Sequence, residues 1–350
     1  MTQITRNLIL LSGLCIVIGA PASEAHEAWI LTPDEIEALA AAPVPPLFLS
    51  QLWLGVAAAV CCVVVGIALH LEKRFGAQLN DIMQPLAARA LDVGPVILRL
   101  SVAVMLGLAA FGGLPRHGVA PWTEPTFLVP DMPLGLVSGW DVLAPMQFAL
   151  ALLLALGFAV RFAGLVLIGF SVLGIALFGS GFLSYTPHFA APGLVLAITA
   201  GGAWSLDRMF KTERILHPGD ALWQAGWRAA QVLIGVGFIY LAVVYKLLQP
   251  TLIIAILEHG NVPTFGLPLP VVALIMTGVE ITAGALIAMG RLIRPLSVIL
   301  IGAMTFLAIV LGETPLFHAN LYGMMVFFLM AGPTLPQPSV TEIKTQQVAA

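Results

Sequence analysis

The sequence has little charge and almost no cysteine, and these two shortages exclude several classes of protein. Only 9% of its 350 residues are charged, whereas a soluble domain carries about 25%. The net charge of −3 gives no basic surface for nucleic acid. The three cysteines, Cys15, Cys61 and Cys62, all lie in apolar runs. This placement indicates apolar packing, and neither a disulfide framework nor a thiolate metal site.

Apolar residues are what the sequence has in abundance. They make up 59% of the chain, and the mean hydropathy is +1.00. This composition predicts an all-α integral membrane protein surrounded by a lipid bilayer. The chain shows no P-loop, no dinucleotide-binding glycine pattern, no nucleophile elbow and no haem-attachment motif.

The first 25 residues resemble a secretory signal. The apolar stretch Leu8–Ala20 is too short to cross a bilayer comfortably. Ser23 and Ala25 supply small residues at the −3 and −1 positions of a cleavage site. The pattern therefore predicts a signal peptide over 1–25, and cleavage would make His26 the first residue of the mature protein.

An exported segment, 26–48, follows the predicted signal peptide. Thr32 suits the N-cap of a helix, Pro33 its first position, and Glu35 its third. These residue types predict a short helix over about 33–41, to which we assign a structural role at the membrane surface.

Nine apolar runs come next, and most approach the roughly 20 residues that a helix needs to cross a membrane. They lie at about 49–71, 95–114, 143–160, 163–183, 190–206, 228–248, 269–290, 295–312 and 317–333. With His26 outside, almost all flanking Lys and Arg residues fall on the inner side. We therefore predict a multi-pass protein of the bacterial inner membrane, with a periplasmic mature N-terminus and a cytoplasmic tail, 336–350.

The chain also resembles itself at an offset of 129 or 130 residues. The matching pairs are Arg99 with Arg228, Arg161 with Arg291, His188 with His318, and Gly193 with Gly323. This self-similarity predicts one extra transmembrane helix, 49–71, followed by two four-helix repeats, 92–208 and 222–335. Four crossings return the chain to the same side, so the repeats are expected to be parallel.

Several stretches resemble the DoxX-like membrane family. In the second repeat they are YLAVVYKLLQP, GVEITAGALIAMGRLIRP and TPLFHANLYGMMVFFLMAGP, and the first repeat ends on GLVLAITAGGAWSLDR. The resemblance implies four-helix membrane modules, here doubled. Some members resemble subunits linked to thiosulfate oxidation with quinone as acceptor, and others resemble accessories of thiol and oxidative-stress systems. It therefore implies a redox-associated inner-membrane subunit with a protein partner, and leaves open whether the chain is itself an oxidoreductase.

Glu280 lies in the middle of the seventh apolar run, where a carboxylate is costly unless it is paired or protonated. Lys246, at the outer end of the sixth run, is its natural partner. Two interpretations stay open for these catalytic candidates. They form either a structural ion pair that joins two helices or a proton-handling pair beside a quinone or another substrate.

Five of the seven histidines fall on the predicted outer side: His26, His117, His188, His259 and His318. Imidazole is a common ligand of copper and zinc. A mature N-terminal His26 would offer copper both its amine and its Nδ1, and in this feature alone the chain resembles histidine-brace copper proteins. The candidate metal ligands are His26, His188 and His318, with His117 and His259 as second choices. The alternative is that all are ordinary loop residues.

Three functions therefore remain open at the level of sequence. The first is a redox-associated subunit that works with quinone, and the second is a copper-binding membrane protein. The third is a small-solute transporter, suggested by the parallel repeats and the intramembrane charge pair. Co-purified quinone, bound copper, or solute flux into vesicles would distinguish them.

Overall fold

The computed structural model describes residues 30–115, 118–212 and 218–336, and every regular element within them is a helix. Six helices are long and apolar enough to cross a membrane. They are α4 (Gln51–Ala87), α5 (Ala90–Ala110), α7 (Val160–Phe178), α10 (Asp220–Leu241), α12 (Leu269–Ala288) and α13 (Ile293–Leu311). The all-α class and the bilayer environment are thus confirmed. The predicted signal peptide, His26 and His117 lie outside the described residues.

Shorter helices complete the bundle. Three of them lie at the predicted runs 143–160, 190–206 and 317–333: α6 (Leu143–Leu156), α8 (Thr186–Thr199) and α14 (Ala319–Ala331). The others are α2 (Pro33–Ala40), α3 (Pro46–Leu49), α9 (Leu206–Met209) and α11 (Pro250–His259). A π-helical turn, η5 (Ala242–Leu247), extends α10, and the 3-10 turn η6 (Pro315–His318) leads into α14.

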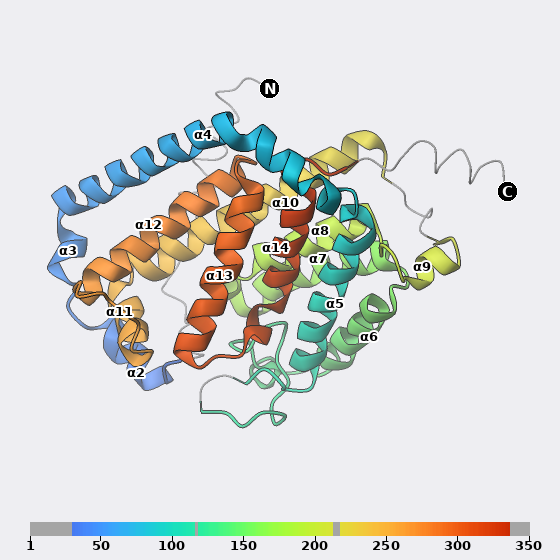
Figure 1. Cartoon of the computed structure of the whole chain (residues 1–350). Coiled ribbons are helices and arrows are strands. Elements are labelled where there is room, and N and C mark those ends of the chain that lie inside the picture. Colours follow the sequence, from blue (N-terminus) through green and yellow to red (C-terminus); the bar gives the residue numbers. More distant parts are fainter. Residues whose placement is uncertain (1–29, 116–117, 213–217, 337–350) are drawn as a thin grey trace, which may run out of the picture.

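The two groups of four helices pack on each other reciprocally. Within the first group α5 packs on α6 and α7 on α8, and within the second α10 packs on α12 and α13 on α14. Between the groups, α5 lies against α14, and α10 lies against α8 (Figure 1). The first helix of each group therefore contacts the last helix of the other. Two similar units related by an approximate twofold axis produce this pattern.

The helix ends show that the two groups are offset by 133 residues after their first helices, and not by 130. Gly157 ends α6 and Gly290 ends α12, both with positive φ. Arg161 donates to carbonyls at the end of α8, and Arg294 donates to carbonyls at the end of α14. The counterpart of Arg161 is therefore Arg294, and the predicted pairing with Arg291 is wrong. The second group has four extra residues after its first helix, and the comparison of identical residues at a fixed offset did not detect them.

Helix α4 is longer than the predicted span of 49–71. It continues to Ala87, and its 37 residues extend to roughly 56 Å, well beyond the ~30 Å of a hydrocarbon core. No glycine or proline between 77 and 84 ends the helix earlier. Figure 1 shows α4 at the periphery of the bundle, where it contacts α12 and α14. None of its apolar stretch is buried, so this surface is available to lipid.

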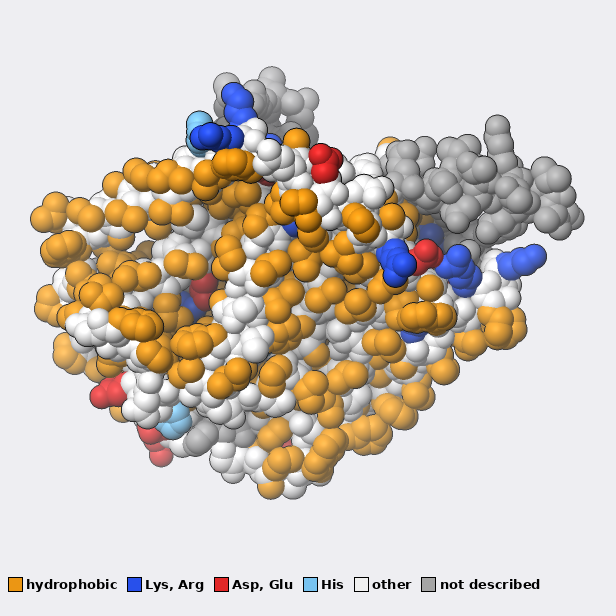
Figure 2. Space-filling view, viewed as in Figure 1, with side chains coloured by type: hydrophobic (Ala, Val, Ile, Leu, Met, Phe, Trp, Pro, Cys, Tyr) orange, Lys and Arg blue, Asp and Glu red, His pale blue; other side chains and the backbone are white. Residues whose placement is uncertain are grey.

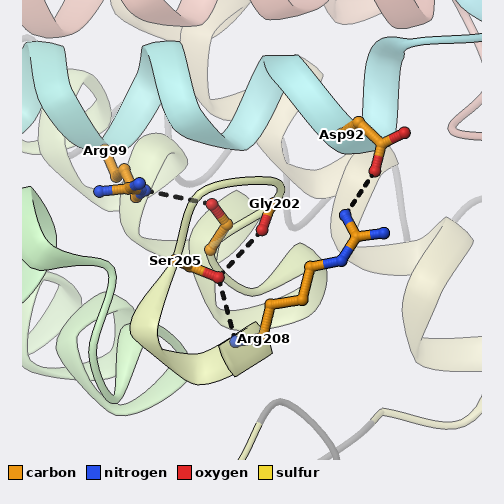
Figure 3. A network of polar contacts seen from close by, with 6 residues as sticks. Asp92, Arg99, Gly202, Ser205 and Arg208 are labelled. Carbon is orange, nitrogen blue, oxygen red and sulfur yellow. Dashed lines mark hydrogen bonds and ion pairs between the residues drawn. The ribbon is translucent and has the colours of Figure 1, made fainter. Parts of the chain in front are cut away.

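A buried arginine joins three chain segments at one end of the first group. Arg99 is 2% exposed and donates to the carbonyls of Leu154, Ala155, Gly201 and Trp204. These carbonyls belong to the end of α6 and to the turn after α8, where helix dipoles present partial negative charge. The neighbouring turn is closed by Ser205 and by the exposed ion pair of Arg208 with Asp92 (Figure 3).

Carboxylates cap the third helix of each group, but they come from different places. Asp207, which is 3% exposed, accepts from the N–H groups of Ala159 and Val160 at the start of α7, both at 2.8 Å. At the start of α13, Glu72 of α4 accepts from Leu292 N–H at 2.9 Å. Glu72 of the extra helix α4 thus caps the start of α13, as Asp207 at the end of the first group caps the start of α7.

Candidate functional site

A cavity of about 160 Å³ lies among the helices of the second group. Its walls come from α10 and η5, α11, α12 and α13, and from the start of α14. Most of the lining is apolar, including Phe238, Ile253, Met276, Met304 and Leu307. An apolar cavity of ~150 Å³ accommodates one benzene-sized molecule. The space therefore suits a single ring.

Lys246 and Glu280 line this cavity and form an ion pair. Their side chains are 16% and 22% exposed, so the pair is largely withdrawn from solvent. The π-helical turn η5 carries Lys246; such turns add a residue and are frequent at functional sites. Oε2 of Glu280 is buried without a hydrogen-bond partner among the described residues. The pair thus keeps an acceptor that a ligand or a water molecule can use.

The cavity meets the lipid-facing surface beside α12 and α13. These neighbouring helices make little contact with each other. Figure 2 shows a small acidic and basic patch recessed in the otherwise apolar surface over this region. A molecule dissolved in the bilayer therefore has a lateral route to the ion pair.

His188 and His318 also line this cavity. His188 is 3% exposed, and its Nε2 has no hydrogen-bond partner among the described residues. His318 ends η6, immediately before α14. Both also line a second cavity of about 10 Å³, together with Tyr185 and Asn320. The structure thus brings two predicted metal candidates together with the predicted charge pair.

The two histidines are neighbours but do not occupy equivalent positions. His318 is the N-cap of α14, which is the place of Tyr185 at the start of α8. His188 lies in the first turn of α8, and its carbonyl accepts from the Asn320 side chain at 2.8 Å. The offset of 130 that paired them in the sequence is therefore wrong by three residues here.

The remaining histidine candidates do not join this cluster. His259 lies at the exposed end of α11 and lines neither cavity. His26 and His117 fall outside the described residues. Among residues 30–115, 118–212 and 218–336, no group of three or more His, Cys, Asp or Glu is arranged to hold a metal ion. A complete copper site would therefore need a further ligand.

The first group lacks the counterpart of the ion pair because its own loop fills the space. Gln147 precedes Glu280 by 133 residues and is fully buried. Its side chain accepts from Leu128 N–H at 2.7 Å and donates to the Thr126 carbonyl at 2.9 Å. Phe127 then packs on the aromatic rings of α7 and the turn after it. The candidate site therefore belongs to the second group.

Sequence reasoning missed three polar residues near the histidines. Glu313 lines the large cavity just after α13 and outside the membrane-spanning segment. Burial raises the pKa of Glu313 to about 7, and the charge of Asp131 adds to the effect. The hydroxyl of Tyr185 donates to the carboxylate of Asp131. No spacing in the sequence connects residues from such distant loops.

Glu313 makes stability depend on pH. Its folded-state pKa of about 7 exceeds the ordinary value of 4.5, so the folded protein binds more protons between these values. Stability should therefore fall as pH rises from 4.5 to 7. Glu313→Gln should remove this part of the slope and stabilise the protein at pH 8 by about 1–2 kcal/mol. Unfolding in detergent across pH checks this, with Glu258→Gln at the exposed end of α11 as control; equal slopes in both variants contradict it.

The cavity thus combines apolar walls, an ion pair and two imidazoles. These groups can hold a ring, donate hydrogen bonds to its substituents and accept protons. Comparison of the chain with protein-family models, with curated proteins and with solved structures finds no match.

Proposed function

We propose that the protein is a redox-associated inner-membrane subunit of the DoxX-like type that binds a lipid-soluble quinone in the cavity of the second group. The observation that supports this most strongly is an apolar cavity of about 160 Å³ with a partly exposed ion pair. A quinone head is a single ring that carries oxygen acceptors, and its tail remains in the lipid. Both the volume and the lateral route beside α12 and α13 suit such a molecule.

The residues of the cavity have the chemistry that a quinone head requires. The ammonium of Lys246 donates a hydrogen bond to a ring carbonyl oxygen, and the Glu280 carboxylate accepts one from a quinol hydroxyl. Reduction of a quinone to a quinol takes two electrons and two protons. In this proposal a redox partner protein supplies the electrons, and the polar end of the cavity supplies the protons.

The proposed topology has nine crossings. The six long helices account for six of them, and α6, α8 and α14 account for the other three. These short helices are too short to span ~30 Å by themselves, but turns extend α8 and α14 at one end. The excess of Lys and Arg on one side supports a cytoplasmic location for that side. The loop 118–142 and the exported segment then face the periplasm.

Quinone analysis of the purified full chain tests this function. We expect about one quinone per protein after mild extraction. Ala308→Leu should reduce this content at least fivefold, because Ala308 is 2% exposed and lines the cavity. Ala303→Leu on the exposed side of α13 is the matched control. Absence of quinone from the wild-type protein, even after reconstitution with quinone-containing lipid, would refute the proposal.

A second candidate function, copper binding, is favoured by the position of Ile30. This residue lines the same cavity as His188 and His318. It lies four positions after His26 in the sequence, a reach of at most about 14 Å. We propose that His26, once freed at the N-terminus, joins these imidazoles around one copper ion.

Copper stoichiometry tests this second function. The wild-type protein should hold one copper ion, and His26→Ala should lose it, whereas His259→Ala should retain it. Equal copper in the wild type and in His26→Ala would end the proposal. Recovery of an intact Met1 start by N-terminal sequencing would do the same.

A further inference from the structure

One end of the large cavity is polar. Glu313, His318 and His188 line it, together with Ile30 of the N-terminal segment. Glu313 lies beyond the end of α13, where the chain leaves the membrane-spanning segment. This end therefore faces the aqueous side that also carries the loop 118–142.

Polar groups continue from this end into the second cavity. Its volume of about 10 Å³ is close to the space that one water molecule needs. Tyr185 lines it and donates to Asp131 in the loop. A line of hydrogen-bonding groups thus runs from the large cavity to the surface loop.

Two unpaired atoms indicate that the large cavity is hydrated. Nε2 of His188 and Oε2 of Glu280 are buried without a partner among the described residues. Buried polar atoms are nearly always satisfied by protein or by ordered water. The cavity of about 160 Å³ has room for several water molecules. The hydrocarbon core of the bilayer holds no water to supply them.

We infer that water enters the cavity from the side of the loop 118–142, between Ile30, Glu313 and His318. The cavity then opens to lipid at one end and to water at the other. It becomes a place where a lipid-soluble molecule meets small water-soluble species, protons included. This inference does not depend on whether the lipid-soluble molecule is a quinone.

Ile30 lies at this entrance and restricts it. Its side chain is 6% exposed and lines the cavity. The segment that carries it is anchored by α2, which packs on α11. Ile36, on α2, is 4% exposed but lines neither cavity. The two isoleucines therefore form a matched pair for a test.

Hydroxyl-radical footprinting of the full chain in nanodiscs provides that test, because the protein contains its own reporters. Met276 and Met304 line the cavity, whereas Met324 and Met325 are fully buried and line neither cavity. We expect the two cavity methionines to be oxidised at least tenfold faster than the two core methionines. Equal protection of all four would show that the cavity is dry and would overturn the inference.

A shorter side chain at position 30 then tests whether water enters the cavity beside Ile30. Ile30→Ala should raise the oxidation rate of Met276 and Met304 severalfold, and Ile36→Ala should leave it unchanged. Equal rates in both variants would overturn the assigned entrance. Quinone content, measured on the same samples, is a separate readout. Hydration without quinone would contradict the proposed function alone, and quinone in a dry cavity would contradict this inference alone.

Discussion

Lys246→Met should destabilise the protein by about 3 kcal/mol, because it leaves a carboxylate unpaired in an apolar cavity. Glu280→Gln should cost less, since an ammonium on a long side chain can move toward the membrane surface. The double variant K246M/E280Q should recover most of the loss, because it leaves no unpaired charge. Unfolding in detergent measures the coupling between the two positions as a double-mutant cycle.

An exposed pair in the same molecule is the control for this cycle. Arg208 and Asp92 are 50% and 57% exposed and form an ion pair at 2.8 Å. Exposed pairs contribute ~0–1 kcal/mol, so Arg208→Met should change stability very little. A coupling between Lys246 and Glu280 no larger than that of the exposed pair would contradict a role for their burial.

The same variants separate the two interpretations of the pair. A structural ion pair predicts that K246M/E280Q regains both stability and bound quinone. A ligand-binding pair predicts that the double variant regains stability but not quinone. We expect the second outcome, because the partnerless Oε2 of Glu280 lies in the cavity wall.

Local signals in the sequence were sufficient where the cause of a structure is itself local. Thr32, Pro33 and Glu35 predicted the start of a helix, and a capping box is present there in the structure. Composition alone indicated apolar helices in a bilayer. The cost of an isolated carboxylate predicted a partner for Glu280, and Lys246 forms an ion pair with it.

The correspondence between residues of distant helices could not be predicted from the sequence in this way. Identical letters at an offset of 130 suggested that Arg291 matches Arg161, but Arg294 is the residue that binds the end of α14. Such a match depends on where each helix stops, and turns with positive φ at Gly157 and Gly290 set those ends. The short helix α11 was likewise missed, because its ten residues are fewer than a span requires.

The cavity itself also required the structure. Its polar end is formed by residues of η6, α8, the loop after α13 and the segment before α2, which are far apart in the chain. The contrast between the groups rests on Gln147, whose polar side chain binds a loop in place of a partner like Lys246. A single sequence does not show where that loop folds.

Asp207→Ala should have the largest effect of any single change in the first group, about 3–5 kcal/mol. The carboxylate is buried and accepts from the N–H groups of Ala159, the N-cap of α7, and of Val160, its first residue. Removal leaves the buried N–H of Val160 and the partly buried N–H of Ala159 without their acceptor.

Two further variants test whether the effect is specific to the buried carboxylate of Asp207. Asp207→Asn keeps one acceptor oxygen and should lose about half as much stability, which separates hydrogen bonding from charge. Asp92→Ala removes a carboxylate that is 57% exposed and should cost less than ~1 kcal/mol. The free energies of unfolding of the three variants, measured in the same detergent, rank the three losses of stability. If Asp207→Ala were as mild as Asp92→Ala, capping by Asp207 would not hold the start of α7, and the end of the first group would be free to separate from it.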